Sequence, residues 1–440
     1  MPVRNLDPAR MLHESLQRRF FMSVFNHCCC GIDVHLSSIK ANLKREGVNG
    51  EVDMDEIRKF GTMTRDLLAL ADWLKEAGCT IVAIESTGVL WKPVFNILEP
   101  DFEVMLINPK HYKSLPGQKT DAKDCRWLCT LLQLGLLKPS FIAPQAVREA
   151  RDLTRHRRRL VEEKTRFINR IHKVLQDGNI KLSSVISDIM GKSGIEMLKM
   201  IIKGEADAAS IAQCARGRMK VKIEQLIQAL NGRVTEHHRF MLTELLDQIS
   251  ILEKKIELFD ARIAEHFKKQ GEEVVQLITL LKTLPGVDKE SASEILAEIG
   301  WNMNQFPTEE DLSSWAGMCP GNNETGGKRK KAKRTNGSKW LQATLGEIAW
   351  AASRTKKTYL KAQYRRLSRR MIKQKAIVAV GHTMLVMIYN MIKYRLPYKE
   401  LGEEYFIQTD KEKLTRMMVH RLEKFGYTVH LIKKEEDNAA

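Results

Sequence analysis

Two apolar runs that each contain a carboxylate decide the fold: CCCGIDVHL at residues 28–36 and TIVAIEST at residues 80–87. Ile81 to Ile84 show no polar alternation, which is typical of a strand covered on both faces, and the run ends in Glu85. The stretch DLLALADWLKEAG, residues 66–78, predicts a helix between the two runs, and FEVMLINPK, residues 102–110, predicts a further strand. Residues 28–146 are therefore expected to form an α/β domain, with sites at the carboxyl ends of its strands.

Four acidic residues are candidate metal ligands. Asp33 and Glu85 interrupt apolar strands, where an unpaired carboxylate is costly, and Asp121 and Asp124 are three apart on a predicted helix and share a face. Two such charges about 5 Å apart repel by about 3 kcal/mol at an effective dielectric near 20, so they need a counter-charge. Hard cations such as Mg²⁺ take oxygen ligands, and a pair about 4 Å apart clamps a phosphodiester. The alternative for each residue is a solvated surface group, because the chain has 54 acidic residues.

The composition favours a soluble protein of several domains with a polyanionic partner. A chain of 440 residues exceeds one core and predicts two or three domains. The formal net charge of +18 points to nucleic acid. We see no apolar run of bilayer length and no signal peptide, so we expect a cytoplasmic protein without membrane contact. The eight cysteines show no zinc or disulfide spacing, and the triplet at residues 28–30 is expected to pack inside a strand.

Residues 147–272 predict a helical, coiled-coil domain. Leu153, Leu160, Phe167 and Val174 recur every seven residues in a strongly basic helix, and a second heptad seam runs from Leu245 to Ile263. The two helices are expected to pair with each other or across a dimer. The basic face is either solvated or in contact with nucleic acid, and its uneven charge favours contact. Its candidate contacts are Arg151, Arg155, Arg158, Arg159, Arg166 and Arg170.

Residues 273–396 predict a further, mostly α-helical domain. Its start, LKTLPGVDKESASEILAEIG, resembles a helix-hairpin-helix, whose turn exposes backbone N–H groups to phosphate; an ordinary helix pair is the alternative. Residues 1–27 are expected to be an extension and residues 397–440 a small tail.

Several motifs together resemble a known family. They are GIDVH, VAIESTGVLWKPVF, INPKHYKSLPGQKTDAKDCRWL, and the block from LPGVDKESASEILAEIG to GSKWLQATLGEIAWAA. Over about residues 28–395 the chain is similar to the DEDD transposases of the insertion-sequence family IS one-ten, which are related to Piv-type DNA invertases. The resemblance implies an RNase H-like amino-terminal domain similar to the RuvC resolvase, and a carboxy-terminal transposase domain.

The resemblance also implies the chemistry. It assigns Asp33, Glu85, Asp121 and Asp124 to the DEDD site, expected to hold two Mg²⁺ ions. The family has a nucleophilic serine in a second motif, where this chain reads PGNNETGGK at residues 320–328, so Thr325 takes the place of the serine. Threonine keeps the hydroxyl but adds a methyl group that stiffens χ1. In the family the nucleophile and the metal site of a partner subunit form a composite centre.

The surroundings of Thr325 suit a phosphate. Gly326 and Gly327 allow a close backbone approach, and neighbouring cations offset the charge. Lys119, just before the predicted helix with Asp121, is a further candidate for phosphate contact. Ser338 is expected to cap a helix. The alternative is that Thr325 merely lies in a basic DNA-binding loop. The cations are Lys328, Arg329, Lys330, Lys331 and Arg334.

The resemblance implies three partners: double-stranded DNA, a structured guide RNA that delegates sequence choice to base pairing, and further copies of the chain in a dimer or tetramer. The basic helix and residues 354–375 are candidate backbone-binding surfaces.

Three functions remain open from the sequence. The first is a site-specific recombinase with a covalent threonine–DNA intermediate. The second is a metal-dependent, junction-resolving nuclease that uses water. The third is a catalytically impaired nucleic-acid-binding regulator.

Overall fold

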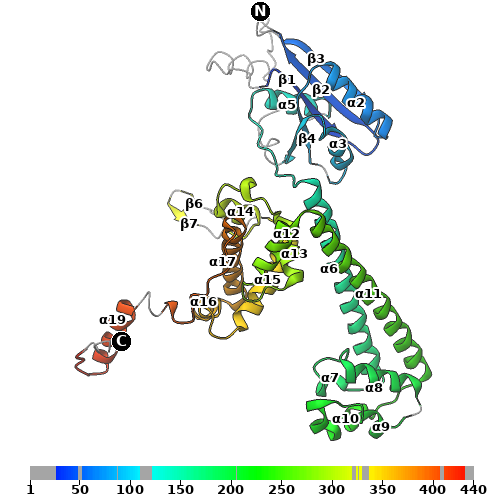
Figure 1. Cartoon of the computed structure of the whole chain (residues 1–440), viewed down its shortest axis with the longest axis vertical. Helices are drawn as coiled ribbons and strands as arrows, with labels where there is room; N and C mark the ends of the chain where they lie inside the picture. Colours follow the sequence, from blue (N-terminus) through cyan, green and yellow to red (C-terminus); the bar gives the residue numbers. More distant parts are fainter. Residues whose placement is uncertain are drawn as a thin grey trace, which may run out of the picture. The chain divides into compact units, whose positions relative to one another are not determined.

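The chain folds into two compact units, Met1–Ile142 and Ala143–Ala440 (Figure 1). The computed structural model describes residues 26–47, 52–86, 88–109, 121–204, 206–319, 324–325, 327–329, 336–406 and 411–431. The division after Ile142 lies close to the expected boundary at residue 146. The expected extension, residues 1–27, lies almost wholly outside the described residues, and the finer domain boundaries stay a prediction.

Unit 1 is built on a mixed five-stranded sheet of order β3-β2-β1-β4-β5. The pairs β1–β2 and β2–β3 are antiparallel, whereas β1–β4 and β4–β5 are parallel. The predicted runs form β1, β4 and β5, whereas the β2–β3 hairpin was not predicted. The strands are β1 (Cys28–Val34), β2 (Ile39–Glu46), β3 (Val52–Phe60), β4 (Ile81–Glu85) and β5 (Glu103–Ile107).

Helices cover both faces of this sheet (Figure 1). On one face, α2 (Thr64–Glu76) and α3 (Trp91–Leu98) pack on Cys30, Ile32 and their neighbours. On the other, α5 (Asp121–Gln133) packs on Cys29, Ile81 and Ala83. The strand side chains alternate between two cores, as a period of two requires.

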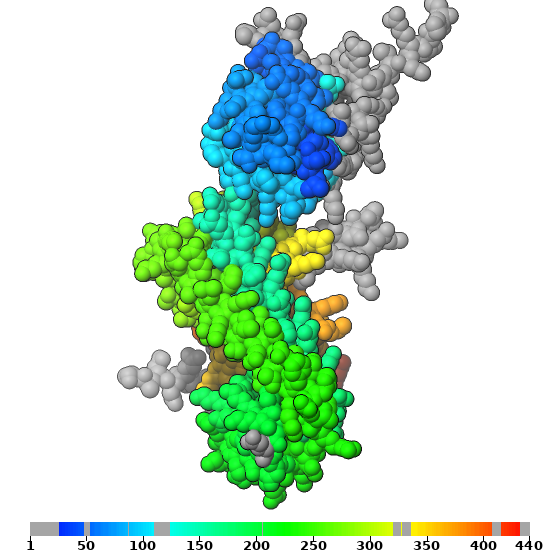
Figure 2. Space-filling model, turned by 90° about the vertical axis from the view of Figure 1, so that its right-hand side faces the viewer, coloured from blue at the N-terminus to red at the C-terminus, as the bar shows by residue number. Residues whose placement is uncertain are grey.

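Unit 2 begins with two long helices, α6 (Gln145–Asp177) and α11 (Glu236–Lys269), which pair with each other in antiparallel directions. The ion pair Lys164–Glu253 (2.9 Å) and the contact between the tilted rings of His156 and Phe259 (centroids 4.7 Å apart) join them. At one end the pair runs into a compact lobe (Figure 2), whose short helices share an apolar core with it. These are α7 (Leu182–Val185), α8 (Lys192–Lys203), α9 (Ala208–Ala212) and α10 (Ile223–Leu230).

The rest of unit 2 is a set of packed helices with one short hairpin. In the turn after α12, Gly286 has φ +87°, and a Cβ there would lie 2.5 Å from the carbonyl oxygen of Ile348. The turn of the expected helix-hairpin-helix is therefore packed tightly on α15. The packed helices are α12 (Glu272–Leu281), α13 (Lys289–Ile299), α14 (Glu309–Trp315), α15 (Lys339–Arg354), α16 (Tyr359–Ser368) and α17 (Lys373–Tyr394); α19 (Lys411–Lys424) follows them in the chain.

We expected no apolar run of bilayer length. Among the described residues, however, helix α17 is long and apolar enough to cross a membrane, by length and composition alone. More than half of its apolar window is buried within the protein. It packs against α14 and α15, and the hydroxyl of the fully buried Tyr389 donates to the carbonyl oxygen of Phe306 at 2.9 Å. These contacts explain why α17 is so apolar: it is a core helix of the protein.

Candidate functional site

The structure places Asp33 and Glu85 side by side at the carboxyl ends of β1 and β4. The parallel register pairs Ile32 with Ile84, so the next residue of each strand is a carboxylate. Both are buried, at 8% and 6% exposure. Cys29, Ile81 and Ala83 contact the core under α5, so by alternation Asp33 and Glu85 lie on the same face of the sheet as α5.

Gly31 allows α5 to lie directly on β1. A Cβ at Gly31 would be 2.5 Å from both the carbonyl oxygen of Cys125 and the backbone nitrogen of Cys129. The Sγ atoms of Cys29 and Cys129 are 3.8 Å apart. Because Cys129 lies against Cys29 and Cys125 against Gly31, α5 runs antiparallel to β1, and its first turn lies toward Asp33.

That first turn contains the other two candidate ligands. Asp124 is half-buried and precedes Cys125. Burial raises the pKa of the Cys125 thiol to about 11, and the negative charge of Asp33 adds to the rise. Position 121 is one helical turn before Cys125; the side chain of Asp121 lies outside the described residues. The fold thus brings Asp33, Glu85 and the helix start with Asp121 and Asp124 to one face of the sheet.

The donor set suits a hard cation. The candidate ligands are all carboxylates, and neighbouring strands are about 4.8 Å apart, a spacing at which two buried carboxylates repel. Oxygen ligands of this kind are those that Mg²⁺ prefers. Among the side chains that the structure describes, no group of three or more metal-ligating residues is found, a test that does not include the side chain of Asp121.

Two residues beside Asp33 were not placed in the site by the sequence. Nε2 of His35 is 3.1 Å from Oδ2 of Asp33. Lys40 pairs with Asp33 in the β1–β2 register. It lies on the α5 face, because Lys44 on the same side of β2 donates to Thr130 of α5 at 2.8 Å. Lys40 was not predicted as a site residue, because it lies opposite Asp33 only through the β1–β2 hairpin, which the sequence did not reveal.

Thr325 lies at the tip of a short hairpin between α14 and α15. The strands β6 (Glu324–Thr325) and β7 (Lys328–Arg329) are antiparallel, and Thr325 pairs with Lys328. A two-residue Gly-Gly loop joins them, and Gly327 is exposed with φ +73°. Two-residue hairpin loops favour glycine because they require positive φ. The backbone of Thr325 therefore flanks a tight turn.

Some sequence-predicted residues of this loop cannot be placed. The structure describes Thr325, Lys328 and Arg329 by their backbones alone. Lys119, Gly326, Lys330, Lys331 and Arg334 lie outside the described residues.

The segment that contains the hairpin is fixed where it enters α15. A Cβ at Gly337 would lie 2.1 Å from the carbonyl oxygen of Ala316, and Gln342 donates to the same oxygen at 2.8 Å. Ser338 caps α15, as predicted, by accepting from the backbone N–H of Leu341 (3.3 Å). Its hydroxyl also donates to Oε2 of Glu298 at 2.7 Å. The two ends of the loop are thus held together and joined to α13.

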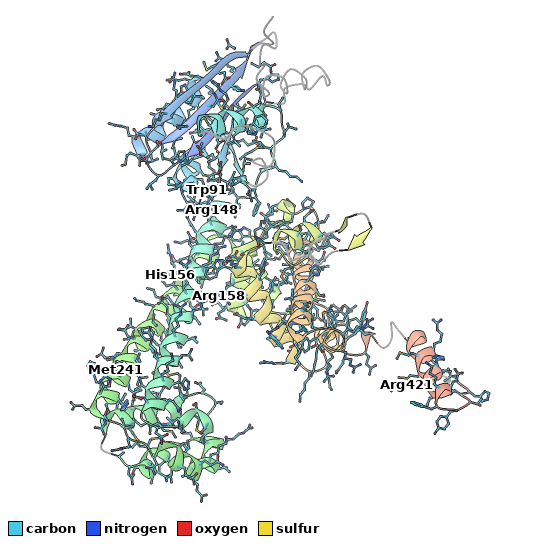
Figure 3. All side chains as sticks on the ribbon, turned by 180° about the vertical axis from the view of Figure 1, so that it is seen from behind. Trp91, Arg148, His156, Arg158, Met241 and Arg421 are labelled. Atoms are coloured by element: carbon cyan, nitrogen blue, oxygen red, sulfur yellow. The ribbon has the colours of Figure 1, made fainter. Side chains whose placement is uncertain are left out.

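Glu298 is the centre of a buried ionic network. It is 2% exposed and accepts two hydrogen bonds from Arg155, at 2.7 and 2.9 Å. Arg151 donates to the backbone carbonyl oxygens of Ala297 and Glu298. Arg158, labelled in Figure 3, extends from α6 and bonds to Glu294 of α13 (3.1 Å) and Glu347 of α15.

This network changes the interpretation of the basic helix. The guanidinium groups of Arg151, Arg155 and Arg158 join α6 to α13 and α15, and their partners are more than 100 positions away in the sequence. Arg159, Arg166 and Arg170 are exposed. Arg159 lies over the ring of Trp340, 5.5 Å from its centroid, and Arg170 over Phe167, 4.9 Å from its centroid.

Comparisons with known proteins agree with this arrangement. A transposase family model, that of the IS110-type DEDD transposases, matches residues 30–180, which include the four carboxylates. A second, described as the transposase IS116/IS110/IS902 family, matches residues 278–365, which include Thr325. The chain is 22% identical over 260 residues to a "Probable family 20 transposase" of Pseudomonas aeruginosa, covering 59% of this chain and 67% of that protein.

The fold and these matches define a transposase. Within that class the chain belongs to the IS110 family, the IS one-ten family of the sequence comparison.

Proposed function

We propose that this transposase is a site-specific DNA recombinase in which the carboxylates of unit 1 bind Mg²⁺ and Thr325 of unit 2 supplies the nucleophile. The placement of the carboxylates carries the proposal: Asp33 and Glu85 are buried neighbours on the face that α5 covers. Two buried carboxylates at the ends of neighbouring strands repel each other, and a bound metal ion would offset that repulsion. The strand order of the mixed sheet supports an RNase H-like, RuvC-like domain.

Two Mg²⁺ ions would be held by Asp33, Glu85, Asp121 and Asp124. When bound, they would supply positive charge to the phosphodiester during attack and departure. The residues of the chain fix the geometry of this site. Gly31 keeps α5 against β1, and Nε2 of His35 lies 3.1 Å from Oδ2 of Asp33, where it would orient this carboxylate.

The covalent step is a transfer of the phosphoryl group to Thr325. The threonine oxygen attacks phosphorus and loses its proton, while the bond from phosphorus to one deoxyribose oxygen breaks and that oxygen takes up a proton. A sugar hydroxyl of another strand then attacks the phosphothreonine, forms a new phosphodiester and releases the threonine. The number of phosphodiester bonds is unchanged, so rejoining needs no external energy source.

The nucleic-acid surfaces of the proposal are the tip of the Thr325 hairpin and the exposed arginines Arg159, Arg166 and Arg170. The duplex DNA of the element and its target would be the substrate, a structured RNA would select the sequence, and two or four copies of the chain would act together. Arg151, Arg155 and Arg158 are no longer part of this surface in the proposal, because they stabilise the helix packing.

Denaturing electrophoresis tests the covalent step. Labelled donor DNA is incubated with Mg²⁺, the RNA and either the wild type, Thr325→Ala, Thr325→Ser or Asp33→Asn. We expect a protein-linked DNA band with the wild type and Thr325→Ser, and none with the other two. Free cleaved ends with Thr325→Ala would instead identify a nuclease that uses water.

A regulator without catalysis predicts another pattern. DNA would then bind tightly, no strand would be cut by any of the four proteins, and Asp33→Asn would change nothing but affinity. Wild-type cleavage contradicts that alternative directly.

A further inference from the structure

Residues 354–375 are the most one-sidedly charged part of the described chain. They contain ten lysines and arginines and no acidic residue, and they span the end of α15, all of α16 and the start of α17. Neighbouring carboxylates contact both ends of α16, where Glu400 accepts from the backbone of Tyr359 and Glu403 pairs with Arg365 in the last turn. Among the described residues, Arg369, Arg370, Lys373 and Lys375 form no ion pair, and all four are exposed.

Two large apolar side chains project from the centre of this charge. Met371 is 38% exposed and Ile372 is 65% exposed, and they connect α16 to α17 between Arg370 and Lys373. We call residues 369–373 the wedge turn. Leu360 of α16 and Val380 of α17 point inward and are 0% exposed, whereas Tyr394, the last residue of α17, is exposed. The exposed pair is therefore not the edge of an apolar helix face.

The wedge turn is held rigidly. The backbone N–H of Met371 donates to Leu367 at 3.1 Å, and that of Ala376 donates to Ile372 at 3.1 Å. The side chain of Gln363 donates to Thr383 at 2.8 Å and joins α16 to α17. Both helices also pack on α15. Side chains on a backbone fixed in this way can stay in place when they press against stacked base pairs, as insertion into a duplex requires.

We infer that the wedge turn binds double-stranded DNA and distorts it: Arg369, Arg370 and Lys373 contact backbone phosphates while Met371 and Ile372 press between base pairs. Apolar side chains flanked by cations bend DNA in this way by partly unstacking one base step. Bent DNA exposes the strained phosphodiesters on which a recombinase acts. The inference rests on the proposed recombination function, and it adds a DNA-distorting element to it.

The positive charge around the wedge turn indicates which kind of partner binds there. A second copy of this chain, with its net charge of +18, would be repelled by a patch without acidic residues. Two side chains are also too small an apolar surface for a stable protein interface. A membrane-binding helix presents a continuous apolar face to the lipid, whereas the apolar faces of α16 and α17 are buried. A polyanion with internal apolar surfaces, such as stacked base pairs, fits both features.

A DNA-bending assay tests this inference without requiring the protein to cleave the DNA. Full-length protein carrying Thr325→Ala is titrated onto a 30-base-pair DNA that has TA steps and a donor and an acceptor dye at its ends. Energy transfer reports bending, and anisotropy reports affinity. We expect the protein to raise energy transfer, and the further change Met371→Ala/Ile372→Ala to abolish the rise while affinity stays within about threefold.

Matched variants separate bending from binding. Leu258→Ala removes a similar apolar side chain that is 67% exposed on α11, and it should change neither signal. Arg369→Ala/Arg370→Ala should weaken DNA binding. It should also reduce the magnitude of the slope of log K against log salt concentration by about 2, as expected for the loss of two phosphate contacts. Thermal unfolding of each variant checks that the fold is intact.

Three results would overturn the inference. The first is unchanged energy transfer in the Met371/Ile372 variant. The second is a loss of binding to structured RNA in that variant with no effect on DNA, and the third is a loss of binding to vesicles with 30% phosphatidylserine alone. If the wild-type surface binds no DNA at all, the proposed recombinase function fails too, whereas binding without bending contradicts this inference alone.

Discussion

Replacing Gly31 with alanine should displace the helix that carries Asp121 and Asp124. The added Cβ would lie 2.5 Å from two backbone atoms of α5, the oxygen of Cys125 and the nitrogen of Cys129. Ordinary contact begins near 3.4 Å, so α5 has to move by about 0.9 Å, the difference between the two distances. Backbone atoms cannot turn aside as a flexible side chain does, and the strand is held by β2 and β4.

The displacement has two consequences of known size. Overpacking of this kind costs about 1 to 3 kcal/mol, which corresponds to a fall in melting temperature of about 3 to 10 °C for a unit of this size. Mg²⁺ requires near-ideal distances of about 2.0 to 2.1 Å, and a shift of about 1 Å in a catalytic group lowers activity about a hundredfold. We therefore expect Gly31→Ala to weaken Mg²⁺ binding and strand cleavage more than it weakens the fold.

Calorimetry provides both readouts, through thermal unfolding and through titration with Mg²⁺. Gly346→Ala in α15 is the matched control, because a Cβ there meets nothing within 4 Å; it should leave Mg²⁺ binding unchanged and add about 0.4 to 1 kcal/mol of stability. If Gly31→Ala unfolds within 0.5 kcal/mol of the wild type and binds Mg²⁺ equally well, the account of how α5 is positioned is refuted.

Three further predictions concern unit 2. Glu298→Ala leaves Arg155 without its buried partner and should cost about 3 to 5 kcal/mol in urea unfolding; a loss below 1 kcal/mol would contradict the network. Burial raises the pKa of Glu294, so its contribution is full below the ordinary value of 4.5 and is lost as the pH rises through the raised pKa. The melting temperature of the wild type relative to Glu294→Gln should therefore fall from pH 4.5 upward, and a constant difference would refute this. Gly327→Ala, at φ +73°, should strain the hairpin by about 1 to 2 kcal/mol and reduce cleavage; full cleavage would speak against the hairpin.

The sequence predicted those parts of the site that local patterns encode. The apolar runs that end at Asp33 and Glu85 form β1 and β4, because continuous apolar residues specify a strand covered on both faces. Ser338 caps α15 as its position before a helical stretch indicated. Gly31 carried a usable signal that was not used, since a glycine inside a strand marks close approach of another backbone.

Long-range pairing accounts for what the sequence could not reveal. Arg155 and Glu298 are 143 positions apart, and no local pattern distinguishes a buried arginine partner from a cation that awaits a phosphate. The same holds for Lys40, which lies opposite Asp33 only once the β1–β2 hairpin forms. Met371 and Ile372, the exposed apolar pair of the wedge turn, likewise carry no local signal, because their exposure depends on how α16 and α17 pack.

The most direct test of the central claim is to locate the bond between protein and DNA by mass spectrometry. Full-length protein is incubated with donor DNA, Mg²⁺ and the RNA, the DNA is digested to a single nucleotide, and the modified peptide is sequenced. The account predicts a nucleotide joined through phosphate to the hydroxyl of Thr325. A nucleotide on any other residue, or cleaved DNA without a modified peptide, would contradict it.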